Sequence, residues 1–142
     1  PHLGSWDLGE RYATSIINDL NRCTVAWIDC NLLLDEKGGP NHVGNYCSAP
    51  IIIDTKSDEI LYQSSYYYLG HFSRFFERGD QVIGCKNNTS ELLALSAINT
   101  NKRVTTAVMN KEEESIPFVF DDGIDCKTIL MPPRSIITII NE

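Results

Sequence analysis

Two polar side chains close an apolar run and are the strongest candidates for chemistry in this sequence. Asp29 and Asn31 lie near the end of the run Thr24–Leu32, whose other members are mostly apolar. Enzymes built as strand–helix barrels place their catalytic residues at the carboxyl ends of the strands. The competing interpretation is structural, with Asp29 buried and satisfied by backbone donors or by a cation.

A single carboxylate does not make a hydrolase. Hydrolysis of a glycosidic bond needs two carboxyl groups, about 5–5.5 Å apart for retention of configuration or about 6.5–9.5 Å apart for inversion. Sequence spacing pairs Asp29 with no second acid, and Asp35, Glu36 and Asp54 fall in predicted loops or at their edges. The residues alone therefore give an incomplete catalytic set.

The other reactive side chains form no recognisable site. His2, His42 and His71 are isolated, and no nucleophile-elbow turn supports a Ser–His–Asp arrangement. The five cysteines are widely spaced, without a Cys-x-x-Cys pair, so we expect no metal site, no cofactor and reduced, partly buried thiols. Residues 38–41 lack the spacing and the lysine of a phosphate loop. Of the consecutive tyrosines 66–68, at most one can line a site on a helix, and core packing is favoured.

Composition excludes several classes of function. The 142 residues carry 12 basic and 19 acidic side chains, a net charge of -7, with 42% hydrophobic residues. This is the composition of a globular domain rather than of a disordered chain. No apolar run approaches the length of a transmembrane helix, and no signal peptide is visible. Scattered basic residues argue against nucleic acid as a partner.

The first half of the chain predicts two helices around a strand. Apolar residues at helical spacing predict a helix over 7–23, and Glu10 three residues after Asp7 suggests that Asp7 is its N-cap. Residues 24–32 are apolar on both alternating faces, which is typical of a central parallel strand.

A second helix is predicted over 64–76. It follows a loop over 37–41 and a short strand over 50–54. We expect Tyr66, Leu69, Phe72 and Phe76 to form the buried face of this helix, and Gly79 to end it in the left-handed conformation.

The second half predicts an antiparallel β-sandwich, because short β-rich segments alternate with turn residues. The expected strands are 81–86, 92–99, 103–110, 116–121, 127–131 and 135–141.

Both halves read as incomplete. An interior strand over 24–32 needs hydrogen-bonded neighbours on both edges, and a complete (β/α)8 barrel needs about 250 residues. From this we expect that the missing elements precede Pro1.

Six short motifs occur in the order found in one known family. They are Leu3-Gly4-Ser5-Trp6-Asp7, Trp27-Ile28-Asp29-Cys30-Asn31-Leu32, Gly38-Gly39-Pro40-Asn41, Asn45-Tyr46, Pro50-Ile51-Ile52-Ile53-Asp54 and Tyr68-Leu69-Gly70-His71-Phe72-Ser73-Arg74-Phe75. The chain therefore resembles the carboxyl-terminal third of glycoside hydrolase family 30, the glucosylceramidase-like retaining β-glycosidases.

The resemblance implies a fold class and a domain division. It implies the carboxyl-terminal portion of a (β/α)8 TIM barrel over 1–78, followed by an antiparallel β-sandwich domain over 79–142. Residues 25–32 would be the eighth barrel strand and 64–76 the last barrel helix. The family's two catalytic glutamates would both lie upstream, so that this chain would hold neither.

The resemblance also implies the roles of five residues. Cys30, Asn45 and Tyr46 match positions that contact the sugar, and Asp29 and Asn31 match positions that support the pocket. Glucosylceramidases usually carry a tryptophan where this chain has Cys30, so the preference for the sugar is expected to differ.

The implied partners are a β-glucoside or glucosylceramide and the upstream part of the same barrel. Family members act on glucosylceramide, on β-1,6-glucans and on xylosides, and the implied compartment is secreted, periplasmic or lysosomal. The alternative from another class is a non-catalytic carbohydrate-binding or interaction module that functions without further residues.

Overall fold

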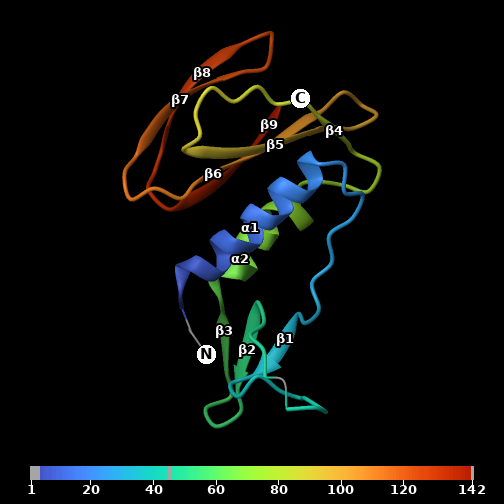
Figure 1. Ribbon diagram of the computed structural model, residues 1–142, viewed down its shortest axis with the longest axis vertical. Coiled ribbons are helices and arrows are strands. Elements are labelled where there is room, and N and C mark those ends of the chain that lie inside the picture. The colour runs from blue at the N-terminus through green and yellow to red at the C-terminus, as the bar shows by residue number, and fades with distance from the viewer. Residues whose placement is uncertain (1–3, 45, 142) are drawn as a thin grey trace. The chain divides into compact units, whose positions relative to one another are not determined.

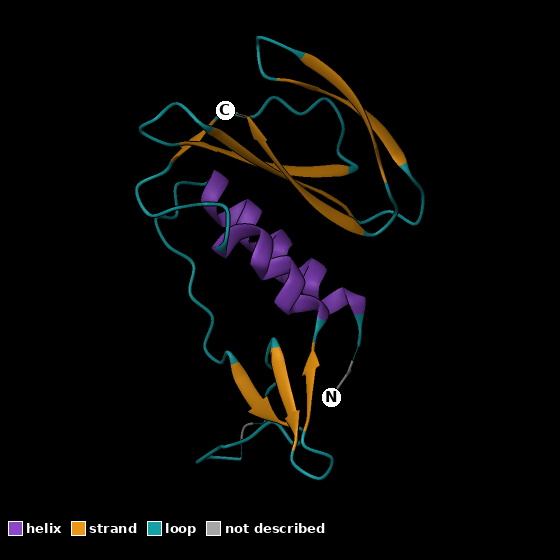
Figure 2. Ribbon diagram, turned by 180° about the vertical axis from the view of Figure 1, so that it is seen from behind, coloured by secondary structure: helices purple, strands orange, loops and turns teal. Residues whose placement is uncertain are grey.

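The computed structural model describes residues 4–44 and 46–141. Contacts divide the chain into two units between Arg74 and Phe75. The first unit contains two helices and a three-stranded sheet (Figure 1), and the second is built from strands (Figure 2). No helix among the described residues is long and apolar enough to span a bilayer.

Helix α1 spans Trp6–Asn21, close to the predicted range. Its buried face includes Ile16 and Ile17, which follow the helical spacing of the apolar residues. The predicted N-cap is wrong: Ser5 occupies that position, and Asp7 lies in the first turn. A carboxylate there still stabilises the helix, because it faces the unpaired N–H groups of the N-terminus.

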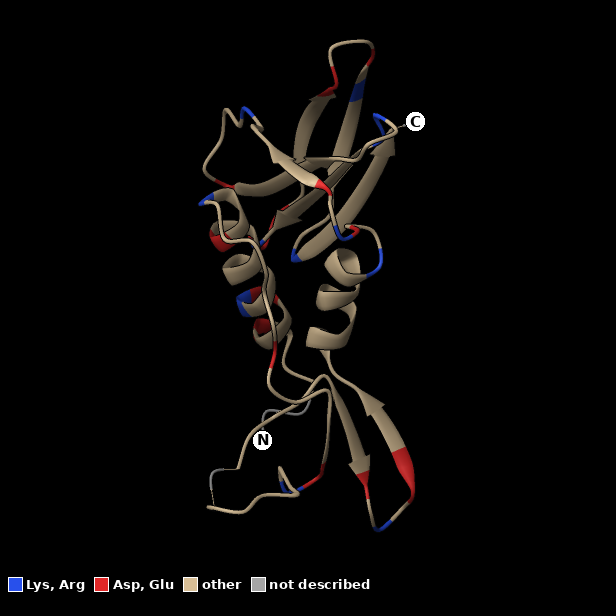
Figure 3. Cartoon of the chain, turned by 90° about the vertical axis from the view of Figure 1, so that its right-hand side faces the viewer, with Lys and Arg blue, Asp and Glu red and all other residues tan. Residues whose placement is uncertain are grey.

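Helix α2 spans Ser64–Ser73 and ends before the predicted residue 76. Gly79 does adopt a positive φ of 99°, but it lies in the turn closed by the Asp80 N–H and the Glu77 carbonyl. The helix contains no Lys, Arg, Asp or Glu, and it is drawn in a single colour in Figure 3. Its stability therefore depends on aromatic packing rather than on surface ion pairs.

The buried face of α2 differs from the predicted one. Tyr68 and Phe72 are buried at i and i+4, whereas Tyr66 and Tyr67 are 40% and 55% exposed. The three tyrosines point in different directions, as helix geometry requires, and only Tyr68 belongs to the core.

The two helices are in close contact at Gly9. The Gly9 N–H donates to Ser64 Oγ at 3.0 Å, and Ser64 Oγ donates to the Ser5 carbonyl at 2.7 Å. The rings of Trp6 and Tyr68 meet edge-to-face, with their centroids 5.7 Å apart. A Cβ at position 9 would stand 2.5 Å from Tyr68 Cδ2, so the contact requires glycine.

A three-stranded sheet completes the first unit. Strand β1 (Leu33–Asp35) pairs parallel with β2 (Ile51–Asp54), and β2 pairs antiparallel with β3 (Glu59–Tyr62). The predicted strand over 50–54 is confirmed as β2. Leu34 and Ile52, both buried, form the small apolar core of this sheet.

The predicted strand over 24–32 is wrong for the described chain. These residues form no helix and join no strand ladder, the backbone bends at Cys30 and at Leu32, and Val25 and Ile28 are 100% and 88% exposed. A strand exists only when its backbone groups find ladder partners. Among the described residues this segment makes isolated backbone hydrogen bonds instead, such as that from the Ile51 N–H to the Leu32 carbonyl at 3.1 Å. The first strand, β1, begins only at Leu33.

The second unit confirms the predicted β-rich segments. Its strands are β4 (Gln81–Ile83), β5 (Leu92–Ile98), β6 (Val104–Asn110), β7 (Ile116–Asp121), β8 (Cys126–Met131) and β9 (Ser135–Asn141). The order β4-β5-β6-β9 forms one sheet and β7-β8 a second, with every pairing antiparallel.

The core of this unit lies between the two sheets. Leu92, Val108 and Met131 are buried there, and Ile116 and Phe118 of β7 pack against them. Burial alternates along β7, which is the period-two pattern of a strand with one face toward the core.

Asn110, at the end of β6, fixes the connection to β7. Its side chain is fully buried. Nδ2 donates to the carbonyls of Glu114 and Pro132, both at 2.8 Å, and Oδ1 accepts the Glu112 N–H at 2.9 Å. One side chain thus satisfies three backbone groups that the turns leave without ladder partners.

We predict that Gly9→Ala destabilises the protein by about 1–3 kcal/mol, because the new methyl group forces the two helices apart. Thermal or denaturant unfolding measures the change. Gly70→Ala in α2 is the matched control: a Cβ added at position 70 would meet nothing within 4 Å, so alanine is neutral or stabilising. Equal stability of both variants would contradict the close contact.

We predict that Asn110→Ala costs about 2–3 kcal/mol, because it removes three hydrogen bonds that a fully buried amide makes to partly buried backbone groups. The Pro132 carbonyl keeps Ser135 Oγ as a second donor. The free energy of unfolding of Asn101→Ala, a change in an exposed turn, is expected to stay within about 0.5 kcal/mol of the wild type. A similarly small effect at Asn110 would show that the turns do not depend on its amide.

Candidate functional site

Segment 24–32 alternates between half-buried and exposed side chains from Trp27 onward. The half-buried side chains are Trp27, Asp29 and Asn31, and the exposed ones between and beyond them are Ile28, Cys30 and Leu32. Alternation with a period of two is the side-chain pattern of extended backbone. The segment therefore separates Asp29 and Asn31 on one side from Cys30 on the other.

A cavity of about 380 Å³ lies on the half-buried side. Its walls include Arg11 and Tyr12 from α1, Trp27 and Asp29 from the segment, and Ser48 from the chain before β2. Charged, hydroxyl and aromatic groups thus meet in one cavity within the first unit.

Asp29 is the central polar group of this cavity. Its Oδ1 accepts the N–H of Cys30 at 2.8 Å. Its Oδ2 is buried and accepts no hydrogen bond of normal geometry from the described residues. A carboxylate oxygen without a donor is costly to bury, so Asp29 is the group whose environment is least complete.

Tyr12 lies beside this carboxylate. Burial first, then the negative charge of Asp29 and the hydrogen bond that Asp29 can accept, raise the pKa of Tyr12 to about 12. The nearby positive charge of Arg11 acts in the opposite direction. The ring of Tyr12 also meets that of Trp27 edge-to-face, with centroids 5.7 Å apart and planes at 67°.

The loop after β1 is folded back on itself. Asp35 Oδ1 accepts the N–H groups of Lys37 and Gly39, at 2.9 Å and 2.8 Å. Gly38 has a φ of 86°, and a Cβ there would stand 2.5 Å from the Cys47 carbonyl. Glycine is thus required at position 38, where the outgoing part of the loop touches the returning part at Cys47, the residue after Tyr46.

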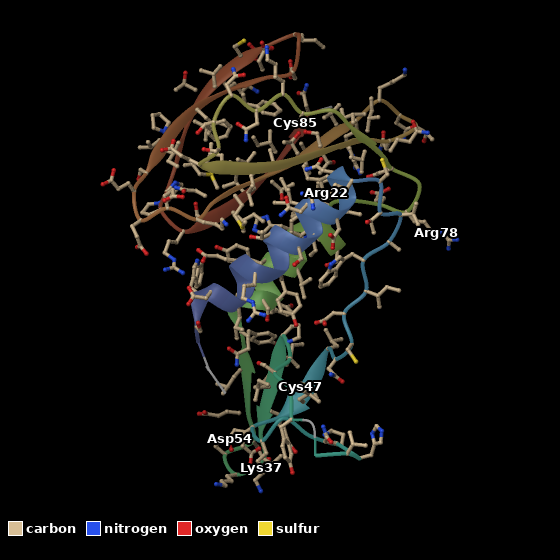
Figure 4. The ribbon with its side chains drawn as sticks, viewed as in Figure 1. Arg22, Lys37, Cys47, Asp54, Arg78 and Cys85 are labelled. Carbon is tan, nitrogen blue, oxygen red and sulfur yellow. The ribbon has the colours of Figure 1, made fainter. Side chains whose placement is uncertain are left out.

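Figure 4 labels three residues around this loop and the three-stranded sheet. Cys47 lies at the three-stranded sheet, whereas Lys37 and Asp54 lie where β1 and β2 end.

The structure separates the predicted sugar-contacting residues from the predicted supports. Cys30 and Tyr46 are exposed, Tyr46 to 68%, while Asp29 and Asn31 are half-buried. Asn45 lies outside the described residues. The roles assigned to these five side chains stay predictions.

Sequence reasoning missed Tyr12 and Trp27. A signal was present for Trp27, because it lies two residues before Asp29 and so shares its face in extended backbone. Nothing local could pair Tyr12 with that face, since the contact depends on how α1 packs.

The cysteines differ from expectation in one respect. All five are free thiols, but each is exposed rather than partly buried. Across residues 4–44 and 46–141, no group of three His, Cys, Asp or Glu side chains is arranged to hold a metal ion.

Comparison with known families assigns both halves of the chain. Residues 1–76 match the glycosyl hydrolase family 30 TIM-barrel domain, and residues 79–139 match the family 30 β-sandwich domain. The chain belongs to glycosyl hydrolase family 30. Its fold is accordingly the carboxyl-terminal part of a TIM barrel followed by an antiparallel β-sandwich, as the motif order implied.

Individual relatives agree with this assignment. The lysosomal acid glucosylceramidase of Mus musculus is 36% identical over 121 residues, which are 84% of this chain and 24% of that protein. The crystal structure of SrfJ from Salmonella typhimurium superposes with a TM-score of 0.88 at 29% identity, over 93% of this chain and 30% of that one.

A third match shows the fold alone. The endo-β1,6-glucanase BT3312 is 23% identical, with a TM-score of 0.79 over 96% of this chain and 33% of that one. This family 30 chain spans about a quarter of the length of the curated relatives it matches.

We predict that Tyr12 titrates far above an ordinary tyrosine. Absorbance of tyrosinate against pH is expected to show one group at a pKa of about 12, which Tyr12→Phe removes and Asp29→Asn moves toward 10.0. Because the folded-state pKa lies above the unfolded value, this group stabilises the fold below pH 10.0, and the contribution is lost as pH rises through about 12. A titration unchanged by Tyr12→Phe would contradict the assignment.

Proposed function

We propose that the intact protein containing these residues is a retaining β-glycosidase, and that this family 30 chain forms one wall of its sugar pocket together with the sandwich. The observation that carries the proposal is the match of both family domains in order along the chain. The division into 1–78 and 79–142 belongs to the same proposal.

The mechanism would be double displacement. One carboxylate attacks the anomeric carbon and forms a covalent glycosyl-enzyme, and a second protonates the leaving group and then activates water. In the family these two glutamates lie upstream of the motif that begins at Leu3. We therefore propose that residues 1–142 supply neither of them.

The exposed face of segment 24–32 would form the pocket wall. Cys30 and Tyr46 are open to solvent in this chain, as groups that touch a sugar must be, and Asn45 is assigned with them from the motif. Asp29 and Asn31 lie on the opposite face and would support the wall.

Segment 24–32 joins no ladder among the described residues. This observation favours the proposal that its partners are neighbouring strands of the same barrel. Its exposed apolar side chains and its N–H and C=O groups would be covered by flanking strands, and a segment left uncovered favours aggregation. The proposed partners are thus a β-glucoside or glucosylceramide and the remaining barrel strands.

The decisive experiment uses the intact protein with an aryl β-glucoside and with glucosylceramide. We expect turnover, and we expect a 2-fluoro-glycoside inactivator to label a glutamate outside residues 1–142, because it traps the glycosyl-enzyme. A label within residues 1–142 would overturn the placement of the nucleophile. Sugar binding without turnover would favour the non-catalytic carbohydrate-binding module instead.

Cys30→Trp tests the proposed pocket wall. An indole adds an aromatic face and one donor, so kcat/KM for the aryl β-glucoside is expected to change by about tenfold. Cys85→Trp, also at an exposed free cysteine but in the second unit, is the control and is expected to leave kcat/KM unchanged. Equal effects at both positions would place Cys30 away from the sugar.

A further inference from the structure

The half-buried face of segment 24–32 is tied to helix α1 by two aromatic residues whose role no motif indicates. We propose that Tyr12 and Trp27 are positioning residues of the sugar pocket: they hold Asp29, and Asp29 in turn fixes the peptide that aims Cys30 at the opposite face. The inference rests on the proposed function, because Cys30 acts on a sugar only there.

The first step is the attachment of the segment to α1. The rings of Tyr12 and Trp27 meet edge-to-face at 5.7 Å, a favourable geometry for an aromatic pair. Helix α1 is itself held by its buried face, which includes Ile16 and Ile17. Trp27 is therefore attached to a rigid element, although the backbone around it joins no strand ladder among the described residues.

The second step concerns Asp29 Oδ2 and the hydrogen-bond donor proposed for it, the phenol of Tyr12. Its Oδ2 is buried beside the phenol of Tyr12, and both line the same cavity. Since the phenol stays protonated up to a pKa of about 12, it can donate a hydrogen bond at any physiological pH. Arg11 also lines the cavity, but it is exposed, and water competes for its guanidinium.

The third step carries the effect to the other face. Asp29 Oδ1 accepts the Cys30 N–H at 2.8 Å, so the orientation of the carboxylate and that of the 29–30 peptide are linked. If Asp29 turns to find another donor for Oδ2, this hydrogen bond is strained or lost. The direction of the Cys30 side chain then changes without any substitution on the exposed face.

The test compares Tyr12→Phe with Tyr67→Phe in the intact protein. In Tyr12→Phe, phenylalanine keeps the ring contact with Trp27 and removes only the donor. Tyr67 is an exposed tyrosine of α2 that does not line the cavity, so Tyr67→Phe removes the same hydroxyl group elsewhere. Two quantities are measured: the alkylation rate of Cys30 relative to Cys85 by peptide mass spectrometry, and the ratio of kcat/KM for aryl β-glucoside to that for aryl β-xyloside.

For Tyr12→Phe we expect both the relative alkylation rate of Cys30 and the glucoside-to-xyloside ratio to change by about threefold or more. Tyr67→Phe is expected to change neither quantity. A merely structural loss lowers the activity on both substrates in proportion, so it does not move the ratio.

Wild-type values of both quantities in Tyr12→Phe would overturn the proposal, and so would a change in activity with an unchanged ratio. Should Tyr12→Phe fail to fold, Trp27→Phe tests the same attachment and is expected to move both readouts in the same direction. Absence of turnover in the wild type would refute the proposed function alone, because the alkylation measurement needs no substrate.

Discussion

The close approach of α1 and α2 at Gly9 is the constraint on which the rest of the first unit depends. Because position 9 has no side chain, Ser64 reaches the helix backbone and Tyr68 packs across it. This contact fixes α1, and α1 presents Tyr12 to the segment that follows. The absence of a side chain at position 9 thus helps to determine, about one helical turn later, where the polar face of the site can form.

Segment 24–32 has one face that is packed within the first unit and one face that is open. One face is organised, with Asp29 bound to the backbone of Cys30 and enclosed beside Tyr12. The other face is apolar and open, and its backbone groups have no ladder partners among the described residues. Such a segment gains order from whatever pairs with its edges, which agrees with its place in a family of barrel enzymes.

Local chemistry explains why the strands of the second unit were predictable. Antiparallel neighbours joined by short turns leave turn residues in the sequence, so β7 and β9 have the predicted bounds, and β7 also shows period-two burial. The buried role of Asn110 was not predictable, because its partners at Glu114 and Pro132 come together only when two turns converge.

The sequence by itself determined the helices, the β-rich second half and the family, because helical spacing, turn residues and motif order are properties of neighbouring residues. It also placed Asp29 and Cys30 next to each other as candidates. Only the tertiary structure decided which face of the segment is half-buried, that Tyr68 rather than Tyr66 is buried, and that Tyr12 lies against Asp29. These outcomes depend on how helices pack and which backbone groups find partners, and no short stretch of sequence contains that information.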